Sequence, residues 1–186
     1  MADTLIIGDG PGGLSAALFL ARGGQEVILF GKDKTAMHWA QLNNYLGVES
    51  MHGSEFQRLG RAQVTAAGGT LRDDTVTGLE QSDEGFAVTT ESGERLCATY
   101  LILSEGKGPK LAARIGLEKN DEGAITVDSN GLSAVPNAYV VGRSTRPGRS
   151  QAIISAGDGA AAAIDILSRA AGKSVCDWDS PPSDKD

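Results

Sequence analysis

The stretch Leu5-Ile6-Ile7-Gly8-Asp9-Gly10-Pro11-Gly12-Gly13-Leu14 decides the fold of this chain. An apolar run leads into glycines spaced as Gly-x-Gly-x-x-Gly, and an alanine-rich helical segment follows at once. In such a pattern Gly8 permits the tight turn, Gly10 lets the backbone approach a pyrophosphate, and Gly13 lets the helix pack closely on the strand. Free N–H groups at the start of the helix attract phosphate oxygens. Because strand, spacing and helix occur together, we expect a dinucleotide-binding unit rather than an ordinary glycine-rich turn.

The composition is that of a single globular domain. The 186 residues are 40% hydrophobic and 5% aromatic, so the core must consist of Ala, Leu, Ile and Val. A net charge of −7 argues against nonspecific nucleic-acid binding. The sequence shows no apolar run of membrane-spanning length, and its two cysteines lie far apart, so we expect no signal peptide and a cytoplasmic protein. We expect one domain over residues 1–175 and an acidic, flexible tail over residues 176–186.

Strand-like and helical segments alternate along the chain, which is typical of an α/β protein. The first part of the sequence predicts strands at residues 4–8 and 26–30 and a helix at residues 12–23. It also predicts a long loop at residues 31–53, with a short helix near residues 37–42. A further helix is predicted from an N-cap at Ser54 to residue 67. The second part predicts a small antiparallel meander with strands at residues 70–72, 74–81, 86–91 and 95–98. Strands at residues 100–104, 124–127 and 138–141 and a helix at residues 151–170, which Gly172 ends, complete a Rossmann-like domain with a central parallel sheet, a β-meander insertion and a C-terminal helix.

Taken in order, these motifs resemble the FAD-binding domain of the thioredoxin reductase branch of the pyridine nucleotide-disulfide oxidoreductase superfamily. Residues 8–14 are similar to the family's glycine motif, and Asn44-Tyr45-Leu46-Gly47 resembles its Asn-x-Pro-Gly loop, with Leu46 where the proline usually stands. Other segments with this resemblance are residues 53–56, 101–106, 123–128, 135–142 and 150–157. The resemblance covers nearly the whole chain and implies FAD as the cofactor.

One departure from the family concerns the connection between residues 101–106 and 123–128. In the full-length reductases, an NADPH domain with a redox-active Cys-x-x-Cys lies at this point. Here residues 107–122 connect the two segments, which is too short for a βαβ nucleotide fold, and the sequence has no Cys-x-x-Cys. We therefore expect a stand-alone FAD domain that is not itself a dithiol thioredoxin reductase.

A second departure is Arg143. The family usually has Ala-Gly-Asp here, and its aspartate accepts a hydrogen bond from the flavin ribityl chain, whereas this chain has Val141-Gly142-Arg143. Arg143 either contacts phosphate through its guanidinium group or belongs to a solvated basic loop with Arg146 and Arg149.

The resemblance also implies further contacts with FAD. Phe30-Gly31-Lys32 stands where the family carries an acidic residue for the adenosine ribose, and Asp33 is displaced from that position. Asn44 either faces the flavin or makes a turn, and Val76 either contacts adenine or is a core residue. Gln151 and Ala152 begin a helix whose N-terminus would stabilise reduced flavin, unless Gln151 is only a cap. The expected FAD-binding residues are Gly8, Gly10, Pro11, Gly12, Gly13, Phe30, Gly31, Lys32, Asn44, Val76, Ser104, Gly106, Gly142, Arg143, Gln151 and Ala152.

The resemblance implies an oxidoreductase whose electrons come from NAD(P)H at the flavin face or from a partner redox protein, and which forms a homodimer. One alternative is a non-catalytic FAD-dependent sensor or binding module. Another is a fragment of an NAD-binding dehydrogenase, against which the meander and residues 151–157 argue. His38 and His52 have no cysteine or acidic cluster at metal-ligand spacing, so we expect no metal site, and the sequence assigns no catalytic residue.

Overall fold

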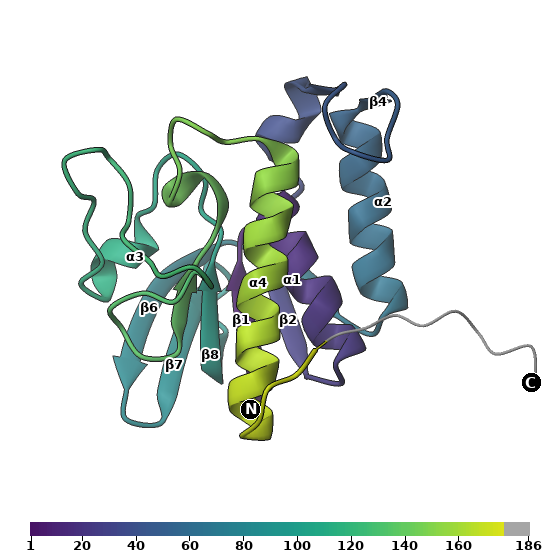
Figure 1. The fold of residues 1–186 in the computed structure, drawn as a ribbon. Coiled ribbons are helices and arrows are strands. Elements are labelled where there is room, and N and C mark those ends of the chain that lie inside the picture. Colours follow the sequence, from purple (N-terminus) through teal and green to yellow (C-terminus); the bar gives the residue numbers. More distant parts are fainter. Residues whose placement is uncertain (177–186) are drawn as a thin grey trace, which may run out of the picture.

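A parallel sheet forms the centre of the molecule in the computed structural model, which describes residues 1–176 (Figure 1). β1 (Ala2–Ile7) lies between β2 (Val27–Phe30) and β8 (Arg95–Leu103) and is parallel to both. β5 (Thr70–Arg72) extends the sheet beyond β2, and β9 (Ala138–Val140) pairs in parallel with the end of β8. All residues of β1 except Asp3 are buried, as expected for a parallel strand covered on both faces.

An antiparallel meander continues the sheet on the side of β8. β6 (Val76–Ser82) pairs with β7 (Gly85–Thr90), and β7 pairs with the first half of β8. The prediction of two strands at residues 95–98 and 100–104 is wrong, because Ala98 pairs with both Phe86 of β7 and Ala2 of β1, so one strand serves both parts of the sheet. The strand predicted at residues 70–72 forms beside β2 and not in the meander.

Helices cover one face of the sheet. α1 (Pro11–Arg22) and α4 (Ala152–Ala171) lie side by side across it, and α2 (Gly53–Ala66) packs next to α1 (Figure 1). Apolar residues between these helices and the sheet, such as Leu14, Ile102 and Ile166, form one core cluster. The predicted end of the last helix is confirmed, since Gly172 adopts a left-handed conformation with φ 63°.

The opposite face of the sheet is covered by α3 (Leu111–Arg114) and its flanking segments. Leu101 and Leu103 of β8 pack there with Leu117 and Ile125 in a second core cluster. The strand predicted at residues 124–127 is wrong: Ile125 makes only an isolated bridge to Lys119, and its N–H donates to the carbonyl of Ser144 at 2.9 Å rather than to a neighbouring strand.

Two predictions near residues 31–54 are also corrected. The predicted helix near residues 37–42 is the short 3-10 helix η1 (Ala36–Trp39), followed by a ribbon of β3 (Gln41–Leu42) and β4 (Met51–His52). α2 begins at Gly53, and His52 is its N-cap, since the His52 Nδ1 accepts the Ser54 N–H at 3.2 Å. Ser54 is instead the second residue of the helix, and its hydroxyl lies 3.0 Å from the Nδ1 of His38.

The described part of the chain holds no helix with the length and apolar character needed to cross a membrane. The predicted acidic tail lies outside the described residues, except for residue 176.

Candidate functional site

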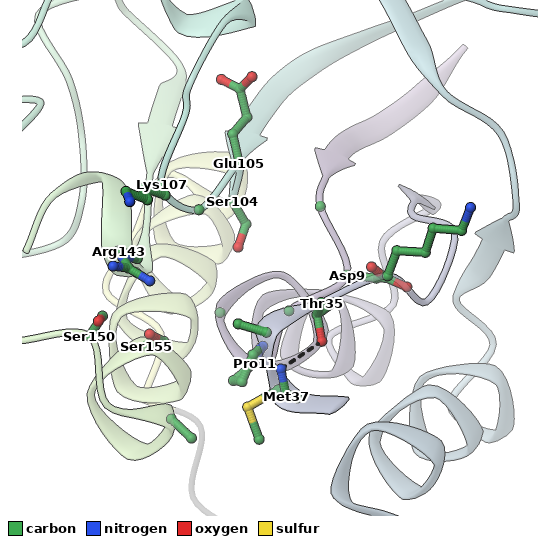
Figure 2. A pocket seen from close by; sticks show the side chains of 18 residues that line it. Asp9, Pro11, Thr35, Met37, Ser104, Glu105, Lys107, Arg143, Ser150 and Ser155 are labelled. Atoms are coloured by element: carbon green, nitrogen blue, oxygen red, sulfur yellow. Dashed lines mark hydrogen bonds between the residues drawn. The ribbon is translucent and has the colours of Figure 1, made fainter. Parts of the chain in front are cut away.

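A cavity of about 400 Å³ opens where β1, β8 and β9 end (Figure 2). In α/β sheets, ligands bind at these carboxyl ends of the strands. The walls come from residues 8–12, 34–37, 104–107 and 142–143, together with Ser150, Ala152 and Ser155. Segments far apart in the sequence therefore meet at one edge of the sheet.

The glycine turn after β1 combines close packing with an open surface. A Cβ on Gly8 would lie 2.1 Å from the carbonyl oxygen of Ser104, and one on Gly13 would lie 1.9 Å from that of Gly8, so neither position admits a side chain. At Gly10, by contrast, a Cβ would have no atom within 4 Å. The turn thus holds β1, β8 and α1 together and leaves an open approach to its backbone at Gly10.

The N-termini of two long helices face this cavity. α1 begins after Gly10 and α4 begins after Gln151, and neither N-cap residue supplies a side-chain hydrogen bond to its helix. The first-turn N–H groups are therefore available to an anion, which the helix dipoles also attract. The starts of the helices are in close contact, because a Cβ on Gly12 would lie 3.1 Å from the carbonyl oxygen of Ser155.

The charged side chains of the cavity favour an anionic ligand. Among the described residues, Lys34, Lys107 and Arg143 line the cavity and form no ion pair through their side chains. Glu105 is occupied elsewhere: its carboxylate accepts the N–H groups of residues 110–112 at 2.9 to 3.0 Å, and Figure 2 shows it pointing away. Figure 2 also shows Lys107 and Arg143 at one end of the cavity and Asp9 at the other.

The residues predicted from the sequence divide between the lining and its surroundings. Those that line the cavity are Gly8, Gly10, Pro11, Gly12, Ser104, Gly106, Gly142, Arg143 and Ala152. Those outside the lining are Gly13, Phe30, Gly31, Lys32, Asn44, Val76 and Gln151.

Five of the residues outside the lining make contacts elsewhere in the structure. Phe30 is 2% exposed within the core, and Val76 packs against the same cluster. Lys32 forms an ion pair with Glu91 at 3.0 Å. Asn44 donates to the side-chain oxygen of Gln151 at 3.0 Å, which joins the loop of residues 31–53 to the residue that precedes α4.

Sequence reasoning missed some of the lining. The missed residues are Asp9, Lys34, Thr35, Ala36, Met37, Glu105, Lys107, Ser150 and Ser155. Asp9 lies inside the glycine motif, and residues 34–37 belong to a loop whose length alone predicts a site. The other missed residues are immediate neighbours of predicted ones, except Ser155, which lies one helical turn after the start of α4.

Comparisons with known proteins agree with this geometry. A family model described as an FAD binding domain matches residues 3–43. The thioredoxin reductase of Helicobacter pylori is 30% identical over 127 residues, which are 66% of this chain and 40% of that protein. A thioredoxin reductase of Claviceps purpurea is 31% identical over 111 residues, which are 57% of this chain and 35% of that protein. The chain therefore spans less than half the length of these curated relatives.

Solved structures show the same fold. A thioredoxin reductase from Gloeobacter violaceus superposes with a TM-score of 0.86 at 17% identity, covering 96% of this chain and 99% of that one. The atypical thioredoxin reductase TRi from Desulfovibrio vulgaris Hildenborough gives a TM-score of 0.81 at 20% identity, covering 91% of this chain and 99% of that one. At these identities the likeness shows the fold alone.

FAD is the cofactor that the matches indicate, and the residues present fit it. The open backbone at Gly10 and the adjoining helix starts suit a pyrophosphate. The unpaired Lys107 and Arg143 supply positive charge at the same cavity.

Proposed function

We propose that this chain, a thioredoxin-reductase-like FAD-binding protein, is a flavin-dependent oxidoreductase that takes its electrons from a separate donor. The observation that carries the proposal is the cavity itself. One glycine turn, two helix N-termini and unpaired cations converge there, and each of these features favours a dinucleotide. We further propose that residues 1–175 act as one domain and that the protein is a cytoplasmic homodimer.

The residues of the cavity have distinct expected roles toward FAD. The backbone at Gly10–Gly12 would hold the pyrophosphate, and Arg143 would add a charge-assisted contact. The start of α4 would stabilise negative charge on the flavin ring, and the Asn44–Gln151 hydrogen bond would fix the loop beside it. Bound FAD supplies the hydride and electron transfer chemistry, which the protein orients and tunes.

The connection between β8 and β9 supports an external source of electrons. Residues 104–137 fold as α3 and a series of turns and bridges over the sheet. A nucleotide-binding βαβ unit has no counterpart in this described segment, so we propose that NAD(P)H or a partner redox protein approaches the flavin from outside.

A second candidate is a non-catalytic FAD-dependent sensor. One observation favours it: none of the described residues that line the cavity is a cysteine or a histidine, so the lining offers no thiol for electron relay. The two candidates differ in whether the bound flavin is reduced by an external donor.

The test is a visible absorption spectrum of the purified protein with FAD, repeated without oxygen after addition of NADH, NADPH or a general reductase system. We expect the protein to show the visible absorbance of oxidised flavin. We expect one of these donors to bleach it. Flavin that binds but stays oxidised with every donor would favour the sensor. A protein that neither carries nor takes up FAD would contradict both candidates.

A matched pair of variants tests whether the cavity is the FAD site. In Gly10→Val the side chain enters open space at the turn, so we expect folding to persist and FAD affinity to fall by at least about 10-fold, since the backbone approach is blocked. The control is Gly157→Val. Gly157 is exposed and outside the cavity lining, and a new Cβ there would also have no atom within 4 Å. Unchanged FAD affinity in Gly10→Val would place the cofactor elsewhere.

A further inference from the structure

Asp9 places a carboxylate inside a turn that is built for phosphate. It is 4% exposed and lines the cavity. A carboxylate beside a pyrophosphate would be repelled, so its charge must be balanced and directed away from the phosphates. Figure 2 places Asp9 at the end of the cavity opposite Lys107 and Arg143.

One oxygen of this carboxylate is held firmly. The guanidinium of Arg61, on α2, forms an ion pair with Oδ2 of Asp9, and the backbone N–H of Asp33 donates to the same oxygen at 2.9 Å. Arg61 is fixed in turn by Asp73 at 2.6 Å. These contacts balance the charge of Asp9 and set the orientation of its carboxyl group.

The other oxygen is free to accept a hydrogen bond. No hydrogen bond within the described residues involves Oδ1 of Asp9. No buried side-chain oxygen of the described residues lacks a hydrogen-bond partner, so the unpaired Oδ1 is accessible to solvent, in a residue that lines the cavity.

The absence of a side chain at Gly31 makes room for the carboxyl group of Asp9. In dinucleotide-binding folds, an acidic residue about 20 positions after the glycine motif, at the end of the second strand, binds the adenosine ribose. Here that strand is followed by Gly31, and a Cβ on Gly31 would lie 2.2 Å from Cγ of Asp9 and 2.4 Å from its Oδ1. The carboxyl group of Asp9 thus fills the space that the side chain of any other residue at position 31 would need.

Asp33, the other acidic residue near this strand end, is engaged differently. Its carboxylate lies 3.1 Å from the Nε2 of His38, and it does not line the cavity. We propose that Asp9, through Oδ1, accepts the hydrogen bond of the adenosine 2′-hydroxyl of FAD, with Arg61 as its positioning residue. This inference rests on the proposed FAD binding. The same carboxylate would repel an adenosine that carries a 2′-phosphate.

The test compares the dissociation constants of FAD and of its 2′-deoxyadenosine analogue, measured by the change in flavin fluorescence on titration with flavin-free protein. The wild-type chain should bind FAD about 10- to 100-fold more tightly, the range for a hydrogen bond to a charged group. Asp9→Ala should bind the two ligands within about 2-fold of each other, because the acceptor is gone. The control Asp33→Asn removes the charge of Asp33, tolerates its left-handed backbone (φ 53°) and should keep the wild-type preference.

The shape-preserving variant Asp9→Asn covers the case in which the alanine variant does not fold. It keeps a neutral acceptor, so its preference for FAD should fall below that of the wild type without disappearing. Equal binding of both ligands by the wild-type chain, or loss of the preference in Asp33→Asn alone, would overturn the assignment of Asp9. Failure of the wild-type chain to bind FAD would instead overturn the proposed function, and this inference with it.

Discussion

Tyr139 shows how a single buried polar group is stabilised away from the cavity. This tyrosine of β9 is fully buried, and its hydroxyl donates to Oδ2 of Asp165 at 2.5 Å. Burial and this hydrogen bond raise the pKa of Tyr139 well above its ordinary value. Burial alone would raise the pKa of Asp165 as well, but hydrogen bonds from Tyr139 and Arg169 outweigh it and hold that pKa below its ordinary value.

This pair gives a prediction about pH. A lowered carboxyl pKa stabilises the fold above the pKa of the unfolded chain, and the stabilisation is lost as the pH falls through the folded-state value. Tyr139→Phe should therefore lower the free energy of unfolding by about 1.5 to 3 kcal/mol at neutral pH and by less in acid. Urea unfolding of both proteins at several pH values measures the difference. A loss that is equal at every pH would show that packing, not the hydrogen bond, explains the effect.

Single residues also mark the limit of prediction from sequence. Gly8 and Gly10 were predictable because their roles follow from a backbone pattern, and the structure shows the close approach at the first and the open space at the second. The position of Asp9 was not predictable, because its ion pair with Arg61 joins the first turn to α2 across a long sequence separation. The contact between Asn44 and Gln151 depends in the same way on how the whole chain folds.

At the scale of elements, the packing of α1 on α4 depends on glycine in both helices. A Cβ on Gly159 of α4 would lie 2.0 Å from the carbonyl oxygen of Gly12, so the helix backbones are in direct contact. Gly157 lies on the same helix but is exposed, with no atom within 4 Å of a new Cβ. The sequence predicts the α4 helix from its apolar pattern, whereas only the structure distinguishes these two glycines.

Alanine substitutions at the two glycines should have opposite effects. Gly157→Ala should stabilise the protein by about 0.4 to 1 kcal/mol, because alanine restricts the unfolded chain and favours a helix. Gly159→Ala should destabilise it by about 1 to 3 kcal/mol or more, because the methyl group meets backbone that cannot move aside. Thermal unfolding of the two variants, compared with the wild type, measures both. Similar melting temperatures for the two variants would contradict this account of the helix contact.

The strand prediction was wrong where one strand belongs to both the meander and the central sheet. β8 was expected as two strands because its first half is mixed in polarity and partly exposed, as in the meander, and its second half is continuously apolar, as in a buried parallel strand. Both patterns are correct locally, and a single strand carries them because it pairs with β7 over one part and with β1 and β9 over the other. Local sequence could not show that the two runs are continuous.

At the scale of the whole molecule, an acidic chain carries a positive cavity. The net charge is −7, yet the unpaired cations Lys34, Lys107 and Arg143 gather at the ends of the strands. The fold class and the location of the cavity follow from the sequence, since a glycine motif after the first strand places a site at this edge. The positive charge of the cavity cannot be predicted from the sequence. It depends on which basic residues are neutralised by ion pairs, such as that of Arg146 with Asp158.

Occupation of this cavity should stabilise the whole fold. With FAD at about 100 times its dissociation constant, mass action adds about 2.7 kcal/mol, which corresponds to a rise of about 5 to 11 °C in Tm for a chain of this size. Thermal unfolding followed by far-ultraviolet circular dichroism measures the shift. Gly10→Val should show little or none at the same FAD concentration, and an equal shift in both proteins would argue against binding at the glycine turn.

The central position of β1 has a consequence for the order of assembly. β1 precedes β8, one of its partners, by about 90 residues, and the cavity that it helps to form also needs β9 and the start of α4, which come later still. Contacts so distant in sequence require large loops to close before they contribute, which slows folding. The nascent chain therefore presents its glycine turn before the opposite walls exist, and the cavity is complete only after β9 and the start of α4 have folded.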